Sequence, residues 1–130
     1  MSMARPLLVD TDVMVDFLRG NPRAVALLRD HSARIILSGI VAAELYAGAR
    51  NDDELETLDA LLSLFRIVPV SPELARMGGL LRRDYGRSHG VGLADAIVAA
   101  AAAAEGVELK TLNVKHYPMI NGLAPAYRKG

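Results

Sequence analysis

Four short apolar segments, separated by longer stretches of helix-forming sequence, constrain this chain more than any other feature. They are residues 7–9, 34–38, 67–70 and 108–112. Apolar runs of this length are typical of strands buried on both faces. The alternation therefore predicts an α/β fold, with a parallel sheet covered by helices on both faces. Pro69 indicates that the third strand lies at an edge, because proline cannot donate to a strand ladder.

Capping residues indicate where several of the helices begin and end. Asn21-Pro22 and Ser71-Pro72 each offer an N-cap residue followed by proline at the first helical position. The second of these helices is predicted to reach Arg83-Asp84. The segment 86–92 has three glycines and is interpreted as a loop. The alanine-rich segment 93–105 is the most helix-prone part of the chain.

Length and composition favour one folded unit. The 130 residues are 52% hydrophobic, and we interpret 1–130 as a single domain. There is no cysteine, which excludes disulfides and thiolate metal sites. No apolar run is long enough for a signal peptide or a bilayer span, so we expect a soluble cytoplasmic protein with no membrane contact.

The zero net charge hides an asymmetry between the two halves of the chain. Residues 1–65 hold six Lys/Arg against ten Asp/Glu, and residues 66–130 hold nine against five. This distribution allows a basic face beside an acidic pocket, and it equally fits a mixed solvated surface.

Acidic side chains recur where the predicted strands end. Asp10 and Asp12 directly follow the first apolar strand. Glu44 lies on the helix after the second strand, and Asp95 lies in the first turn of the alanine-rich helix. Because the carboxyl ends of parallel strands meet at one edge of a sheet, we expect these acids to converge there, together with the polar residues at the end of the fourth strand, Thr111 and Asn113.

Each acid also has an ordinary structural interpretation. Asp12 could cap the helix that begins near Val13, and an acid such as Asp95 is common in the first turn of a helix. Glu44 could be a surface residue, although no Lys or Arg lies at a helical spacing before Gly48. Asp10 is the least ordinary, since a carboxylate at the exit of a buried strand is costly unless it has partners.

The chemistry of the acids favours a hard cation. Oxygen ligands suit Mg²⁺ or Mn²⁺, which bind through one or two carboxylates and retained waters. The three histidines are scattered along the sequence, which argues against zinc. There is no nucleophile-elbow or phosphate-loop motif.

Four segments, in this order, resemble the PIN-domain ribonucleases, and within them the VapC-like toxins of bacterial toxin–antitoxin pairs. They are residues 8–13, 38–45, 92–100 and 111–117. The resemblance spans nearly the whole chain. No single segment is specific, but all four lie near the family's spacing.

The resemblance implies a three-layer α/β/α fold and a Mg²⁺- or Mn²⁺-dependent endoribonuclease. It also implies a homodimer held inactive by a small antitoxin, with higher-order complexes between the two. Carried onto this sequence, Asp10, Glu44 and Asp95 match the family's catalytic and metal-binding acids. The roles of Glu44, as ligand or as proton acceptor, stay open. Supporting positions are Asp12, Thr11, Thr111 and Asn113.

Two positions depart from the family pattern. Asn113 stands where many relatives carry a fourth acid, and His116 falls where some have Asp. An amide lacks the charge to hold a second cation tightly, so the resemblance leaves one and two metal ions open. Backbone contacts to RNA are expected from basic residues of the second half, each of which could also be a solvated surface charge: Arg82, Arg83, Arg87, Lys110 and Lys115.

Two other functions fit part of the pattern. A phosphatase of the haloacid dehalogenase type also begins with Asp-x-Asp after a strand, with Asp10 as nucleophile and Asp12 as general acid. It would need a later lysine and a further acid pair, for which this chain offers only Lys110 within a strand and Asn113. A PIN-like module that binds RNA or protein without cleavage is the non-enzymatic alternative.

A leucine stripe follows the acidic start at Asp52. Its members, at near-helical spacing, are Leu55, Leu58, Leu61, Leu62 and Phe65. The stripe is interpreted either as a surface for a dimer partner or antitoxin, or as the core-facing side of an ordinary helix.

Overall fold

A four-stranded, fully parallel sheet runs through the centre of the protein, in the strand order β3-β2-β1-β4. This computed structural model describes residues 5–128. In chain order the elements are β1 (Leu7–Val9), α1 (Thr11–Leu18), α2 (Pro22–His31), the 3₁₀ turn η1 (Ser32–Arg34), β2 (Ile35–Ser38), α3 (Gly39–Ala47), α4 (Asp52–Leu62), β3 (Arg66–Val68), α5 (Pro72–His89), α6 (Leu93–Glu105), β4 (Glu108–Lys110) and the 3₁₀ turn η2 (Val114–His116).

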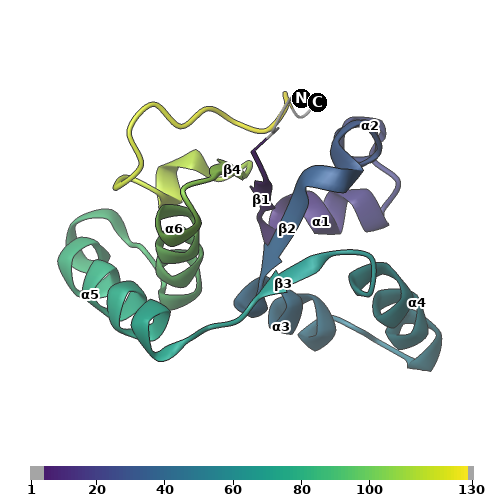
Figure 1. Cartoon of the computed structure of the whole chain (residues 1–130), viewed down its shortest axis with the longest axis horizontal. Coiled ribbons are helices and arrows are strands. Elements are labelled where there is room, and N and C mark those ends of the chain that lie inside the picture. Colours follow the sequence, from purple (N-terminus) through teal and green to yellow (C-terminus); the bar gives the residue numbers. More distant parts are fainter. Residues whose placement is uncertain (1–4, 129–130) are drawn as a thin grey trace.

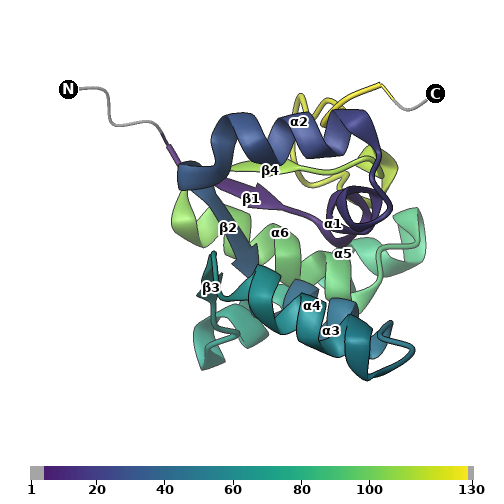
Figure 2. The same cartoon turned by 90° about the vertical axis from the view of Figure 1, so that its right-hand side faces the viewer.

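Helices cover the sheet on both sides. Figure 1 shows α5 and α6 on one side of the strands, and α1, α2 and α4 on the other. Helix α3 follows β2 directly and packs against both α1 and α6. Helix α4 lies beside α3 (Figures 1 and 2). The predicted three-layer α/β/α arrangement with a parallel sheet is confirmed.

Two of the four strands, β3 and β4, end earlier than the sequence predicts. The edge position of β3 is confirmed, but it stops at Val68, directly before the proline that cannot donate to the ladder. Strand β4 stops at Lys110 rather than at residue 112. The reason is local: the backbone N–H of Leu112 donates to a side-chain oxygen of Asp12 (3.0 Å) and so turns away from the ladder.

The predicted helix caps are present, with two differences in helix length. Helix α1 begins at Thr11 with Asp10 as its N-cap, two residues before the predicted start. Helix α5 continues through Gly86 to His89, so the predicted loop 86–92 is wrong for its first four residues. The true C-cap is Gly90, whose φ of 64° is left-handed. Gly86 is instead an internal helix position, beside which the Arg82 side chain packs.

Small residues let α5 approach α6 closely. The central part of α6, residues 96–102, is buried, and five of its seven side chains are alanine. Gly78 of α5 is also buried. A Cβ atom at Gly78 would lie 2.8 Å from Cγ1 of Ile97, too close for the two helices to keep their present separation.

The leucine stripe divides between the core and the surface. Leu58 and Leu62 belong to the hydrophobic core, and Leu61 and Phe65 are packed against it. Leu55, by contrast, is 40% exposed. Most of the stripe therefore serves the core of this protein, and only its first member stands on the surface.

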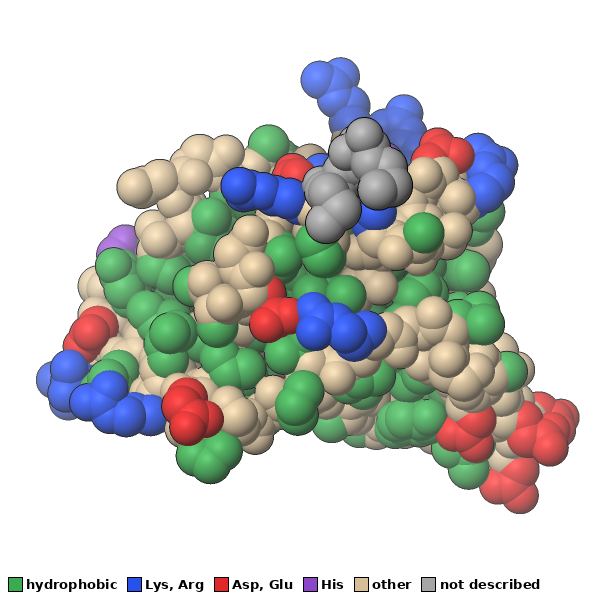
Figure 3. Space-filling view, viewed as in Figure 1, with side chains coloured by type: hydrophobic (Ala, Val, Ile, Leu, Met, Phe, Trp, Pro, Cys, Tyr) green, Lys and Arg blue, Asp and Glu red, His purple; other side chains and the backbone are tan. Residues whose placement is uncertain are grey.

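Acidic side chains gather at one end of one face of the molecule. Helix α4 carries five acidic residues (Asp52, Asp53, Glu54, Glu56 and Asp59), and α5 carries four arginines against two acids. Figure 3 shows acidic side chains gathered at the α4 end of this face, a mixture of basic and acidic side chains at the α5 end, and further basic side chains at the top. Within residues 5–128, no helix is long and apolar enough to cross a membrane.

Candidate active site

Asp10 is the most constrained acid of the predicted site. It directly follows β1, and its side chain is only 5% exposed. Its Oδ1 accepts the N–H of Thr11 at 2.8 Å. Its Oδ2 accepts two hydroxyls, from Thr111 at 2.8 Å and from Tyr117 at 2.6 Å. These neutral donors offset the cost of burying the carboxylate without cancelling its charge.

Asp12 supports the junction between β1 and the segment after β4. Its Oδ1 accepts the N–H of Val13 at 2.8 Å, and its Oδ2 accepts the N–H of Leu112 at 3.0 Å. It therefore stabilises the first turn of α1, although Asp10 and not Asp12 is the N-cap. Burial and the nearby charge of Asp10 raise the pKa of Asp12, and its hydrogen bonds oppose that shift.

Asp95 reaches the same place from the first turn of α6. Its Oδ1 lies 3.4 Å from the Tyr117 hydroxyl, and its Oδ2 lies 3.2 Å from Nδ1 of His116. Burial and the negative charge of Asp10 raise the pKa of Asp95, while His116 and Tyr117 act in the opposite direction. The charge of Glu44 adds to the increase.

Glu44 lies at the rim of the site. It is exposed, and its Oε1 accepts the hydroxyl proton of Thr11 at 2.7 Å. Thr11 belongs to the turn that follows Asp10, so this bond ties α3 to the start of α1. No Lys or Arg of α3 lies at a helical spacing from Glu44. Its partner is instead the neutral hydroxyl of Thr11, from α1.

Tyr117 is a site residue that the sequence reasoning did not single out. Its side chain is 1% exposed, and its hydroxyl lies between Asp10 and Asp95. Burial and the charge of Asp10 raise its pKa well above the ordinary tyrosine value, so the phenol remains a proton donor. The available signal was its place in the 111–117 segment, directly after η2.

Other predicted site residues lie apart from the acids. The Asn113 residue is exposed, and its backbone N–H donates to the Thr111 hydroxyl at 3.1 Å. Lys110 is paired with Glu108 at 2.8 Å, and Arg83 with Asp84 at 3.0 Å. The remaining predicted RNA contacts, Arg82, Arg87 and Lys115, are exposed.

The acids lie at one edge of the sheet, and Asp95 is close enough to both Asp10 and Glu44 for their charges to act on it. Within residues 5–128, no group of three or more Asp, Glu or His side chains is arranged to hold one metal ion. The three-acid centre of Asp10, Glu44 and Asp95 stays a prediction. Asp10 and Asp95, which share the Tyr117 hydroxyl, are the two acids that fit a cation bound through two carboxylates and water. No Lys or Arg of the described part forms an ion pair with either.

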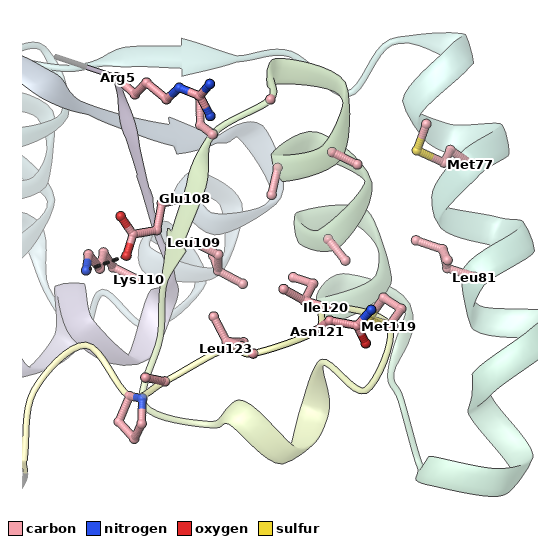
Figure 4. Close-up of a pocket in the computed structure, with 18 of the residues that line it drawn as sticks. Arg5, Met77, Leu81, Glu108, Leu109, Lys110, Met119, Ile120, Asn121 and Leu123 are labelled. Atoms are coloured by element: carbon pink, nitrogen blue, oxygen red, sulfur yellow. Dashed lines mark hydrogen bonds and ion pairs between the residues drawn. The ribbon is translucent and has the colours of Figure 1, made fainter.

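Two grooves differ in their relation to these acids. A groove of about 560 Å³ lies between α1, α3 and α4, and Glu44, Arg19 and Arg50 are among its lining residues. A larger groove of about 1060 Å³ lies between α5, α6, β4 and the segment 119–125 (Figure 4). None of the predicted catalytic acids lines the larger groove, and the Lys110–Glu108 pair is at its side. Of the predicted catalytic acids, only Glu44 lines the smaller groove.

The parallel α/β fold with acids at the carboxyl edge of its sheet is the arrangement expected of a PIN domain. The PIN domain model matches residues 7–117, and the chain belongs to the PIN domain family.

Curated relatives within this family are similar over nearly their whole length. The chain is 40% identical to ribonuclease VapC19 of Mycobacterium tuberculosis over 124 residues, which cover 92% of this chain and 98% of the relative. It is 39% identical to ribonuclease VapC10 of the same organism over 128 residues, covering 93% and 92%.

Solved structures with this fold include toxin–antitoxin complexes. A toxin–antitoxin complex from Klebsiella pneumoniae matches with a TM-score of 0.81 and 28% identity, covering 95% of this chain and 99% of the other. VapBC2 from Rickettsia felis, bound to a DNA fragment from its promoter, matches with a TM-score of 0.73 and 25% identity, covering 92% and 96%. The resemblance to VapC-like PIN proteins stated from the sequence is confirmed.

Proposed function

We propose that this protein is a metal-dependent endoribonuclease and the toxin of a toxin–antitoxin pair, with residues 1–130 as a single PIN-like domain. The observation that carries the proposal is the pair Asp10 and Asp95, brought from β1 and α6 to the same tyrosine hydroxyl. Similarity to ribonucleases VapC19 and VapC10 over more than nine-tenths of the chain supports the same activity.

In this proposal Asp10 and Asp95 hold Mg²⁺ or Mn²⁺. Asp12 supports them by accepting the N–H of Leu112, which fixes the segment after β4. When bound, the ion would lower the pKa of a water and offset charge on the phosphoryl group. Thr11, Thr111 and Tyr117 donate to Asp10 and fix the orientation of its carboxylate.

Glu44 is assigned to the outer side of the site. It is exposed, lines the groove of about 560 Å³ and is oriented by Thr11, so it can take a proton from water at the mouth of the site. Arg19 lines the same groove and is suited to a phosphate group of an RNA strand, whereas Arg50, also in the lining, is paired with Glu54 at 2.9 Å. The basic end of α5, including Arg82, Arg83 and Arg87, leads into the loop before Asp95 and offers a second set of phosphate contacts.

The proposed partners are a small cognate antitoxin, a second copy of the chain and an RNA substrate. The first follows from the likeness to a toxin–antitoxin complex at 28% identity. The test is cleavage of RNA by purified protein, freed of antitoxin, with Mn²⁺ or Mg²⁺ and with EDTA. Metal-dependent cleavage that is lost in Asp95→Asn supports the proposal. Binding of RNA without cleavage under all conditions favours the non-catalytic alternative.

The phosphatase alternative gains nothing from the geometry. A nucleophilic Asp10 would need an oxygen open to a phosphorus atom, but the residue is 5% exposed and three donors engage its oxygens. Lys110, the only lysine that the pattern offered for such an enzyme, is paired with Glu108 at 2.8 Å.

A further inference from the structure

The surroundings of Asp10 leave very little of its carboxylate free. A carboxylate offers about four lone-pair sites on its two oxygens. Both sites on Oδ2 are engaged, by the Thr111 and Tyr117 hydroxyls, and one on Oδ1 is engaged by the Thr11 N–H. Only a single site on Oδ1 remains for any further partner.

The two hydroxyls are fixed by the fold. Tyr117 is buried, and its backbone is held by the η2 turn through a hydrogen bond to the carbonyl of Val114 (3.0 Å). Thr111 is fully buried, its hydroxyl accepts the N–H of Asn113, and its carbonyl accepts the N–H of Ala126 at 2.8 Å. Neither residue can leave Asp10 without loosening the segment after β4.

We infer that Tyr117 is a positioning residue that makes Asp10 a one-oxygen ligand and thereby selects small octahedral cations over Ca²⁺. The inference rests on the proposed function, which assigns a divalent cation to Asp10 and Asp95. Ca²⁺ takes six to eight oxygens in flexible geometry and gains ligands when a carboxylate binds through both oxygens, whereas Mg²⁺ requires near-ideal octahedral geometry and keeps several waters. A carboxylate with Oδ2 occupied suits the second kind of ion.

The hydroxyl proton of Tyr117 also offsets part of the repulsion between Asp10 and Asp95. The phenol donates to Asp10 at 2.6 Å and approaches Asp95 at 3.4 Å, so one neutral donor faces two carboxylates that repel each other. Removing this oxygen exposes the second lone pair of Asp10 Oδ2 and removes the donor between the acids. The carboxylate then becomes free to bind an ion through both oxygens.

The test is the affinity of the full chain for Mn²⁺ and Ca²⁺, measured by calorimetry in wild type and Tyr117→Phe. Tyr127→Phe is the matched control, because the Tyr127 hydroxyl donates to Asp16 at 2.7 Å, a tyrosine–aspartate bond in which none of the proposed metal ligands takes part. We expect wild type to prefer Mn²⁺. In Tyr117→Phe, Mn²⁺ binding should weaken by about tenfold, as for other partners of a metal ligand, while Ca²⁺ binding is unchanged or tighter. Tyr127→Phe should leave both affinities as they are.

The outcomes separate this inference from the proposed function. The inference would be overturned if Tyr117→Phe weakened the binding of Mn²⁺ and Ca²⁺ equally. It would also be overturned if wild type bound the two ions with equal affinity. If Tyr117→Phe does not fold, Thr111→Val removes the other hydroxyl on Oδ2 and should shift the Mn²⁺/Ca²⁺ ratio in the same direction; if neither variant folds, the wild-type preference decides. Wild type that cleaves RNA with Mn²⁺ but shows no ion preference contradicts only this inference. Wild type that binds neither ion contradicts the proposed function as well.

Discussion

The hydroxyl of Thr11 donates to Oε1 of Glu44 at 2.7 Å and joins two helices that follow neighbouring strands. Thr11 directly follows Asp10 in the chain. It therefore contacts both Asp10 and Glu44, which come from different elements. The backbone N–H of Thr11 engages Asp10 and its side chain engages Glu44. Thr11 therefore orients both Asp10 and Glu44.

This relationship predicts a specific effect of Thr11→Val. The variant keeps the shape and the backbone N–H, but it leaves the Glu44 carboxylate without its hydroxyl donor. We expect RNA cleavage to fall by about tenfold, as for other residues that orient a functional group, with little change in thermal stability because Glu44 is exposed. Thr11→Ser retains the hydroxyl and should cleave at nearly the wild-type rate. Equal activities for Val and Ser would show that the bond does not orient Glu44.

Asp10 and Asp95 should differ in what their removal does to stability. In Asp10→Asn one oxygen becomes an NH₂ group that cannot accept the N–H or hydroxyl protons now donated to it. An unsatisfied buried polar group costs about 1–3 kcal/mol, so we expect a lower free energy of unfolding in urea. Asp95→Asn relieves repulsion between acids and should unfold at a higher temperature than Asp10→Asn, both measured without metal. The reverse order would mean that the bonds to Asp10 contribute little.

The sequence identified the acids but not what surrounds them, and the reason is physical. Asp10, Asp12 and Asp95 follow apolar strands or open a helix, so their convergence follows from parallel topology alone. The role of Tyr117 depends on a 3₁₀ turn and on the return of Ala126 to Thr111, contacts that have no periodic signature. In the sequence Tyr117 follows Lys115 and His116 and precedes Pro118, and this polar context gives no sign that its hydroxyl binds a buried acid.

Helix α5 illustrates a second limit. Three glycines between 86 and 92 favour a helix end at the first of them, but the left-handed residue is Gly90. Gly86 is accommodated inside the helix because the Arg82 side chain packs over it. Which of several glycines ends a helix depends on such packing and not on glycine content.

The metal-free protein should lose stability as pH rises above the ordinary pKa of an aspartate. Burial and the charge of Asp10 raise the pKa of Asp95 above its ordinary value of 3.8. The folded state then holds this proton at pH values where the unfolded chain has released it. The corresponding stability is complete below the ordinary pKa and is lost as pH rises through the raised one. Asp12 acts in the same direction.

Thermal melts in EDTA across this pH range check the linkage. Asp95→Asn should show a smaller decrease than wild type and a higher melting temperature at neutral pH. Mn²⁺ should stabilise wild type by about 2.7 kcal/mol at a hundredfold excess over its dissociation constant, and should stabilise Asp95→Asn much less. Parallel pH curves for the two proteins would exclude Asp95 as the source of the effect.

The division of the leucine stripe predicts different outcomes for neighbouring positions. Leu58 is 4% exposed and belongs to the core, so Leu58→Ala should cost about 2–5 kcal/mol and Leu58→Glu should unfold the protein. Leu55 is 40% exposed, so Leu55→Glu should fold normally. Light scattering on Leu55→Glu then tests whether this surface takes part in self-association. A folded Leu58→Glu variant would contradict the assignment of that side chain to the core.

Close packing between α5 and α6 gives a prediction remote from the acids. Gly78→Ala would place a methyl group 2.8 Å from Cγ1 of Ile97 and should cost about 1–3 kcal/mol as overpacking. Gly79→Ala is the matched control, since its added Cβ meets nothing within 4 Å. Because alanine favours the helix over glycine, Gly79→Ala should be neutral or stabilising in urea unfolding. Equal destabilisation by the two variants would show that the contact with Ile97 is not the cause.

The central claim is that Asp10 and Asp95 form the metal-dependent centre of a ribonuclease. The most direct measurement is single-turnover cleavage of RNA by antitoxin-free wild type and Asp95→Asn, each with Mn²⁺ and with EDTA. We predict cleavage by wild type with Mn²⁺ only, and a loss of about a hundredfold or more in Asp95→Asn while its circular dichroism is unchanged. Cleavage by wild type in EDTA, or by folded Asp95→Asn at the wild-type rate, would contradict the claim.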